Sequence, residues 1–251
     1  MTGRAAARLR RWNLAVGGLH ALQAALILAL AGGAALPVTA SWLEGPPGSD
    51  LRGGPEVLFD VPIGPAVAAF LALAAVDHLL VAGPLRGRYE RWLAAGRNPA
   101  RWWEYSVSAS LMVVLIAMLS GVSEASALIA LFGANAAMIL FGLVMEAVNR
   151  PGAPVDWRPF RYGCLVGAVP WIAIAVQLAV GGANADVPGF VVAIFASLFV
   201  LFNSFAANMW LQFRGRGRWR DPLVVERVYL GLSLVAKSAL AWQVFAGALA
   251  G

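Results

Sequence analysis

Seven long apolar stretches, separated by short polar breaks, dominate the pattern of the chain. They cover residues 13–36, 62–84, 99–122, 125–148, 162–180, 188–213 and 222–249. Each is close to or above the roughly 20 mainly apolar residues that a helix needs to cross a bilayer. Proline recurs at the predicted helix starts, where its missing N–H costs least. The pattern predicts an all-α membrane protein built as a seven-transmembrane helix bundle.

Composition agrees with this prediction. Of the 251 residues, 60% are hydrophobic and 13% are charged, whereas an ordinary soluble domain has about 25% charged residues. No signal peptide with a cleavage site is recognisable, so we expect the first span to remain as an uncleaved anchor. The single cysteine, Cys164, excludes an internal disulfide and a multi-cysteine metal site. We expect a single domain over residues 1–251.

The distribution of arginine predicts the orientation of the bundle. One side receives the N-terminal tail and the breaks after the second, fourth and sixth spans, and the other side has only Arg52. Such a bias places the basic side in the cytoplasm, so we expect a cytoplasmic N-terminus, an extracellular C-terminus and a multi-pass protein of the cell membrane. The net charge of +6 then needs no nucleic-acid partner. The arginines of the basic side are Arg4, Arg8, Arg10, Arg11, Arg86, Arg88, Arg91, Arg97, Arg101, Arg150, Arg158, Arg161, Arg214, Arg216, Arg218 and Arg220.

The longest outer break, residues 37–61, carries Glu44, Asp50, Glu56 and Asp60. We expect an ordered lid there, with room for a short hairpin. No other break is long enough for a second domain.

Lys237 is the most informative residue of the chain. It lies deep in the last predicted span, and it is the only lysine. A bare ammonium at that depth is costly, so ionisable groups inside spans are functional candidates. A structural ion pair within the bundle is the plain alternative. The chemical alternatives are an ion site and a Schiff-base nucleophile.

Glu104, near the start of the third span, is the predicted partner of Lys237. Glu104 and Ser108 are four residues apart, as are Ser233 and Lys237, so each pair shares a helix face. The two faces together offer a carboxylate, an amine and two hydroxyls, which is a compact counter-ion site. A carboxylate favoured by the helix dipole near an N-terminus is the alternative for Glu104.

His20 and His78 fall in the inner halves of the first two spans, at the depth predicted for Glu104, and Gln23 lies one turn beyond His20. A single helical histidine is more often a satisfied core residue than a ligand. A zinc site of the two histidines and Glu104 is possible by residue type, but no motif spacing supports it. Asp77 adjoins His78 and points about 100° away around the helix.

Three further ionisable residues, Glu146, Glu226 and Arg227, are expected near inner helix ends, where their side chains reach water by snorkelling. The outer halves of the spans carry no Asp, Glu, His, Lys or Arg. Because a proton pump needs a relay on both sides of its switch, this pattern favours a sensor. Apolar side chains that suit a bound polyene, although each also fits ordinary helix packing, are Met138, Trp171, Phe202, Phe205, Met209 and Trp242, with Asn135 as a polar contact.

Several segments resemble the heliorhodopsins, a family of microbial seven-helix retinal proteins with inverted topology. The segments that carry the resemblance are LVAKSALAWQ at 234–243, RWWEYSVSAS at 101–110, FNSF at 202–205, FGAN at 132–135, VPWI at 169–172, LHALQ at 19–23 and LEGPPG at 43–48. They are spread over essentially the whole chain.

The spacing Gly163-x-x-x-Gly167 in the fifth span allows a close helix approach, including one across a dimer.

The resemblance implies all-trans retinal on Lys237 as a Schiff base, with Glu104 as the sole carboxylate counter-ion and Ser108 and Ser233 hydrogen-bonded around the pair. It implies a homodimer that senses light and regulates a partner protein without ion transport. Relatives are expected to have an apolar or aromatic residue where this chain has Asp77. The resemblance also implies a water-holding cavity on the cytoplasmic side, formed by His20, Gln23, His78, Trp102 and Tyr105.

The leading hypothesis is therefore a light-sensing retinal protein, a photoreceptor that is not an enzyme. A light-driven or passive ion transporter is the alternative from a second class. A membrane enzyme that uses the two histidines and a metal ion is the third.

Overall fold

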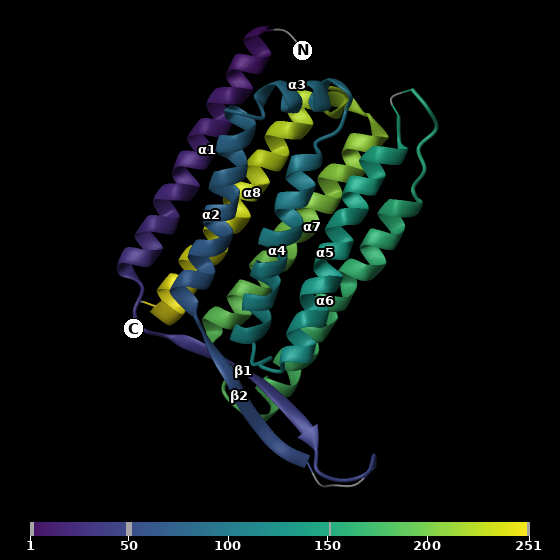
Figure 1. Cartoon of the computed structure of the whole chain (residues 1–251). Helices are drawn as coiled ribbons and strands as arrows, with labels where there is room; N and C mark the ends of the chain where they lie inside the picture. The colour runs from purple at the N-terminus through teal and green to yellow at the C-terminus, as the bar shows by residue number, and fades with distance from the viewer. Residues whose placement is uncertain (1–2, 49–51, 151, 250–251) are drawn as a thin grey trace.

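Seven helices that are long and apolar enough to cross a membrane make up the bundle in the computed structural model, which describes residues 3–48, 52–150 and 152–249 (Figure 1). This confirms the predicted seven-helix bundle. The helices are α1 (Gly3–Leu30), α2 (Ile63–Ala82), α4 (Pro99–Leu119), α5 (Ala125–Val148), α6 (Arg158–Asn184), α7 (Gly189–Arg214) and α8 (Pro222–Val244).

The predicted bounds of the first and fifth spans are wrong at their ends. The first helix begins at Gly3 instead of residue 13 and ends at Leu30 instead of residue 36. Likewise, α6 begins at Arg158 and runs to Asn184. Hydropathy detects only the part of a helix that contacts lipid, whereas arginine is a good helix former and prolongs the helix into water. The first helix stops early because strand pairing begins at Ala35.

Local capping explains two of the helix starts. The Asn98 side chain accepts a hydrogen bond from Arg101 N, and Pro99 follows as the first residue of α4. Asp221 accepts from Leu223 N ahead of α8, which begins at Pro222. Side-chain caps of this kind satisfy backbone N–H groups that have no partner inside the helix. Both starts follow arginine-rich loops.

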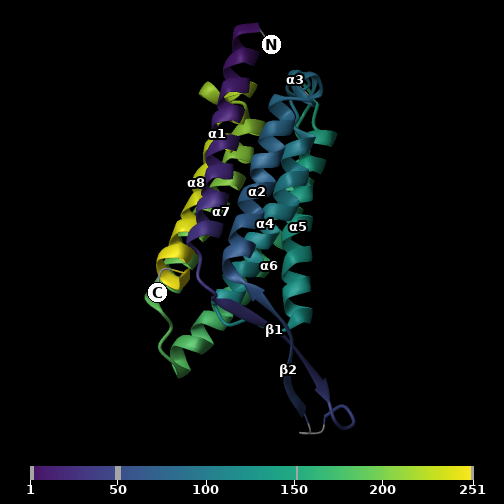
Figure 2. The same cartoon turned by 60° about the vertical axis from the view of Figure 1, so that its left-hand side comes forward.

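Two short helices lie at the end of the bundle where the N-terminus is found, which we call the arginine-rich end. The first is α3 (Arg86–Ala94), which lies across this end between α2 and α4 and buries Tyr89 and Leu93 (Figures 1 and 2). The second is the 3-10 helix η1 (Gly217–Arg220), which joins α7 to α8. The C-terminus lies at the opposite end (Figure 1), where α8 continues as a π-helical turn, η2 (Phe245–Leu249).

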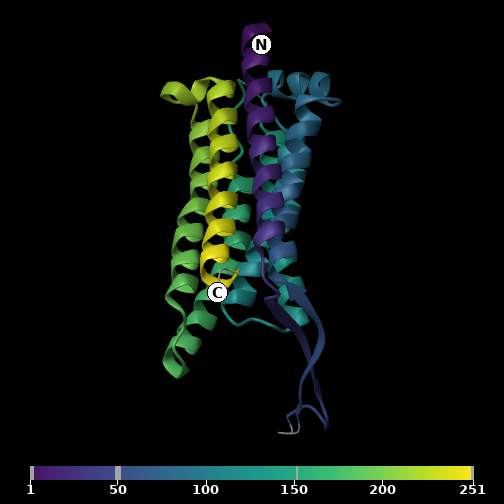
Figure 3. The same ribbon diagram turned by 90° about the vertical axis from the view of Figure 1, so that its left-hand side faces the viewer.

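The opposite end, which we call the hairpin end, holds two antiparallel strands, β1 (Ala35–Leu43) and β2 (Arg52–Pro62). They occupy the segment expected as an ordered lid; Asp50 of that segment is outside the described residues. Thr39 N donates to Ser123 O at 2.8 Å, and Ser41 Oγ donates to Glu124 at 3.2 Å. These bonds tie the hairpin to the turn between α4 and α5, and beyond them it projects past the helix ends (Figure 3).

The helices pack mostly against their neighbours in sequence, and α1 also packs against α8, while α6 and α7 contact each other sparingly. The Gly163-x-x-x-Gly167 spacing serves this packing inside the chain. A Cβ added at Gly167 would lie 2.7 Å from Met138 Cγ, and one at Gly163 would lie 3.2 Å from Phe141 Cβ. Small residues therefore allow α6 to approach α5 closely.

Candidate functional site

Lys237 on α8 and Glu104 on α4 form a buried ion pair. Lys237 Nζ lies 3.2 Å from Glu104 Oε1, and the two side chains are only 4% and 7% exposed. Nζ also donates to Ser233 Oγ, one turn earlier on α8, at 3.0 Å. A buried pair is tolerated only when each charge is compensated and hydrogen-bonded. The geometry thus places an amine, a carboxylate and a hydroxyl at one point inside the bundle.

Aromatic and hydroxyl groups surround this pair. Lys237 Nζ lies 4.8 Å from the centre of the Tyr105 ring, which favours the charged amine. The Tyr105 hydroxyl donates to Tyr229 O at 3.2 Å, so the ring is held in place. Ser108, one turn beyond Glu104, is fully buried, and its hydroxyl has no hydrogen-bond partner within the described residues.

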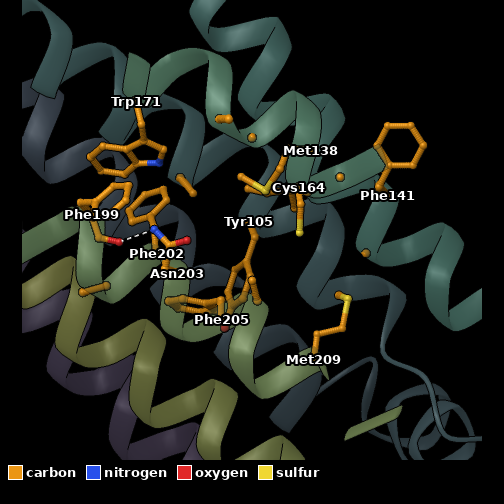
Figure 4. A pocket seen from close by; sticks show the side chains of 18 of the residues that line it. Tyr105, Met138, Phe141, Cys164, Trp171, Phe199, Phe202, Asn203, Phe205 and Met209 are labelled. Atoms are coloured by element: carbon orange, nitrogen blue, oxygen red, sulfur yellow. Dashed lines mark hydrogen bonds between the residues drawn. The ribbon is translucent and has the colours of Figure 1, made fainter. Parts of the chain in front are cut away.

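A largely apolar cavity of about 570 Å³ begins at Lys237 and Ser233 and extends between α4, α5, α6 and α7. Figure 4 shows Trp171, Phe199 and Phe202 gathered at one end, with Tyr105 and Phe205 nearer the middle. The volume falls within the range of about 300–1,000 Å³ that is usual for small-molecule pockets. An amine in the wall of an aromatic pocket fits a long apolar aldehyde such as retinal.

Five of the side chains predicted to contact a polyene line this cavity: Met138, Trp171, Phe202, Phe205 and Met209. Two others lie elsewhere. Asn135 is fully buried and donates to Ser110 Oγ at 3.1 Å, so it joins α5 to α4. Trp242 is 37% exposed and donates to Gln23 Oε1 at 3.0 Å. Five residues correspond to about 140° around a helix, which turns Trp242 away from the face of Lys237.

Sequence reasoning missed part of the cavity wall. Phe195 and Phe199 precede Phe202 along α7, and the Trp171 ring meets all three at 5.4–5.7 Å between ring centres. Their spacing of four and three residues is the signal that places them on one helix face. Cys164 of α6 also lines the cavity.

The structure brings the two predicted histidines together. The rings of His20 and His78 are stacked with centres 5.8 Å apart, and both lie within electrostatic range of Lys237. The other members of the expected inner cavity are placed differently. Trp102 and Tyr105 line the apolar cavity, and Gln23 contacts Trp242 of α8.

A chain of hydrogen bonds leads from the histidines towards the arginine-rich end. His78 Nδ1 donates to Asn13 Oδ1 at 2.9 Å, Asn13 Nδ2 donates to the Tyr89 hydroxyl at 3.4 Å, and Tyr89 donates to Glu226 at 2.9 Å. Burial and the neighbouring Glu226 carboxylate hold the pKa of Tyr89 well above its ordinary value, so Tyr89 remains a donor. Each donor in this series of hydrogen bonds points towards Glu226.

The interpretation of Glu146 and Glu226 as snorkelling side chains is wrong. Arg101, which was counted with the loop between the second and third spans, lies in α4 beside them. All three are buried. Arg101 of α4 pairs with Glu226 of α8, and it pairs with Glu146 of α5 at 2.5 Å. Asn98 also donates to both carboxylates. Sequence position alone suggested helix ends in water, whereas α3 and its flanking loops cover this cluster.

Arg101→Met is expected to destabilise the protein by roughly 3–5 kcal/mol, because it leaves two buried carboxylates without their cation. Thermal or denaturant unfolding of the purified protein measures the effect. Arg97→Met, four residues earlier and exposed, is the matched control and should change stability little. Adding Glu146→Gln and Glu226→Gln to Arg101→Met should restore part of the loss. Equal stability of the two arginine variants would contradict the structural role of the cluster.

The structure shows where Asp77 lies, and it can also be searched for a metal site. Asp77 is half-buried on α2, within electrostatic range of Glu104 and Lys237. In the described part of the chain, no three His, Cys, Asp or Glu side chains gather into a group that could hold a metal ion.

Comparisons with known proteins agree with this geometry. No curated protein matches the sequence significantly. A crystal structure of a light-driven proton pump from Leptosphaeria maculans matches with a TM-score of 0.67 over 98% of this chain and 96% of that chain. Its sequence identity is 16%, so the likeness shows the fold alone, a microbial rhodopsin fold. The family model for heliorhodopsin matches residues 9–249, nearly the whole sequence, and the chain therefore belongs to the heliorhodopsin family.

Proposed function

We propose that the chain holds retinal on Lys237, with Glu104 as the counter-ion, and acts as a light sensor that moves no ions. The observation that carries the proposal is the buried Lys237–Glu104 pair at the wall of an aromatic cavity of about 570 Å³. Membership of the heliorhodopsin family supports the retinal part independently. All-trans retinal in the dark is part of the proposal.

The side chains of the site have separable tasks. The Lys237 amine would be the attachment point, because a neutral amine condenses with an aldehyde to a C=N bond while the aldehyde oxygen leaves as water. Glu104 balances the positive charge of the protonated nitrogen, and Ser233 orients that nitrogen by accepting a hydrogen bond. Retinal, when bound, supplies the absorption of visible light and a light-driven change of shape. The aromatic walls exclude water from the site.

The distribution of polar groups around the site favours sensing over pumping. The stacked histidines lie within electrostatic range of Lys237, and hydrogen bonds lead from His78 through Asn13 and Tyr89 to Glu226 at the arginine-rich end. Towards the hairpin end, the described helices bury no charged side chain. Within the described helices, a proton that leaves the site thus has buried charged or titratable partners on one side only. We further propose a cytoplasmic N-terminus in the cell membrane, a homodimer, and output through a partner protein rather than through an enzymatic activity.

Illumination of cells that express the protein in unbuffered medium is expected to cause no protonophore-sensitive change in pH. The physical reason is that the described helices bury no charged or titratable side chain towards the hairpin end to relay a proton. A glass electrode records the medium, and the same cells with a known light-driven proton pump serve as the positive control. A light-dependent pH change that the protonophore removes, and that Lys237→Ala cells lack, would favour the transporter alternative.

A further inference from the structure

A second cavity, of about 420 Å³, opens at the arginine-rich end, and we call it the vestibule. Three loops meet around it: the loop between α3 and α4, the loop between α5 and α6, and the segment from the end of α7 through η1. Its floor is the buried Arg101–Glu146–Glu226 cluster. It is separate from the cavity at Lys237, since the two share no lining residue.

Three exposed arginines, one from each loop, line the vestibule: Arg97, Arg150 and Arg220. Two surface arginines elsewhere have acidic partners, in the Arg86–Glu90 and Arg158–Asp156 pairs. Within the described residues, no carboxylate lies within ion-pair distance of the three vestibule arginines. Their guanidinium groups keep donors for a further acceptor.

The carboxylates of the floor are occupied by other donors. Glu226 accepts from Tyr89, Asn98 and Arg101, and Glu146 accepts from Arg101 and from Asn98 N. The buried Arg101 Nε, by contrast, has no hydrogen-bond partner within the described residues. Four arginines against two carboxylates leave the lining with two positive charges in excess. That excess matches a dianion.

We propose that the vestibule binds a phosphate group carried by a small organic molecule or by a lipid headgroup. The guanidinium fork matches phosphate oxygens in a bidentate geometry. The volume exceeds that of a bare ion and lies within the usual small-molecule range of about 300–1,000 Å³. Phe213, Trp219 and Val225 provide apolar wall for the body that carries the phosphate. This site does not depend on retinal or on Lys237.

Binding is tested on the full-length protein in nanodiscs of zwitterionic phosphatidylcholine, at constant ionic strength, with phenyl phosphate as the probe and phenol as its neutral control. Calorimetry should show saturable binding of phenyl phosphate only. Arg220→Gln should weaken binding about tenfold, the value of one charge-assisted hydrogen bond. Arg218→Gln, in the same 3-10 helix and with the same loss of charge, is the matched control and should bind like the wild type, because Arg218 does not line the vestibule.

A second measurement needs no variant. Phenyl phosphate should protect Arg97, Arg150 and Arg220 of the wild-type protein from phenylglyoxal, as read by mass spectrometry, and should leave Arg218 reactive. Nanodiscs that contain phosphatidic acid distinguish the sources of the phosphate: competition indicates a lipid headgroup, and unchanged binding indicates a soluble ligand. Absence of saturable binding, equal losses in the two variants, or uniform protection would overturn the proposal. None of these results depends on whether Lys237 holds retinal.

Discussion

Lys237→Ala is expected to abolish covalent retinal binding completely. Lys237 is the only lysine in the chain, so no other side-chain amine can form the attachment. The variant, expressed with all-trans retinal and purified, should show no visible absorption band. Borohydride reduction followed by mass spectrometry should find no retinal mass on the segment that contains residue 237.

The control for this prediction has to separate lost chemistry from lost folding. Removal of the amine also leaves Glu104 buried without its cation, which is costly. Lys237→Arg keeps a positive charge beside Glu104 but supplies no nucleophilic amine. It should remain folded, with a cooperative unfolding transition, and should still bind no retinal covalently. Retinal fixed by borohydride in the Lys237→Ala protein would overturn the assignment of the attachment point.

The seven-helix bundle could be predicted from the sequence because a lipid environment ties each span to a sufficiently long apolar stretch of the chain. Every backbone polar group in hydrocarbon must be satisfied within a helix, so apolar length alone predicts the spans. The same rule explains the errors. The N-terminal residues of α1 are basic and extend beyond the apolar stretch, so hydropathy could not assign Gly3–Trp12 to the helix. The hairpin pairing of Ala35 with Pro62 depends on contacts that periodicity does not encode.

Part of the candidate site could also be predicted from the sequence, for a different reason. A lysine in the middle of a span needs an acidic partner, and few carboxylates lie inside the bundle, so Lys237 and Glu104 could be paired without a structure. The direction of each side chain was harder to predict. Asn135 and Trp242 have suitable chemistry for a polyene pocket but face Ser110 and Gln23. Their helical phase relative to a neighbour is a property of packing, which a single sequence does not specify.

The Arg101 cluster was not predicted because arginine and glutamate are common near helix ends, whereas their burial there is unusual. Arginine and glutamate near a helix end normally reach water, and sequence position gave no reason to expect otherwise. In the structure, Tyr89 of α3 and Asn98 of the next loop cover the cluster and donate to its carboxylates. The sequence feature that accompanies this burial is a tyrosine on a short helix beside an arginine-rich loop, a combination that is also common in solvated loops.

Glu104→Gln is expected to move the visible band to longer wavelength. The Glu104 carboxylate lies 3.2 Å from Lys237 Nζ and stabilises positive charge there in the ground state. Excitation shifts that charge along the chromophore and away from the carboxylate, so its removal raises the ground state more than the excited state. The energy gap therefore narrows. Absorption spectra of the two purified pigments at neutral pH measure the shift directly.

Acid titration gives the same prediction an internal test. In the wild type, protonation of Glu104 removes the same charge, so acidification should move the band to the red, and this transition should be absent in Glu104→Gln. Asp77→Asn is the informative comparison, because Asp77 is half-buried and also within electrostatic range of Lys237. With Glu104 as the sole counter-ion, its shift should be the smaller of the two and its acid transition should persist. If Asp77→Asn removed the acid transition, the counter-ion would have to be assigned to both carboxylates, and the site of this chain would hold a second proton-binding group beside His78.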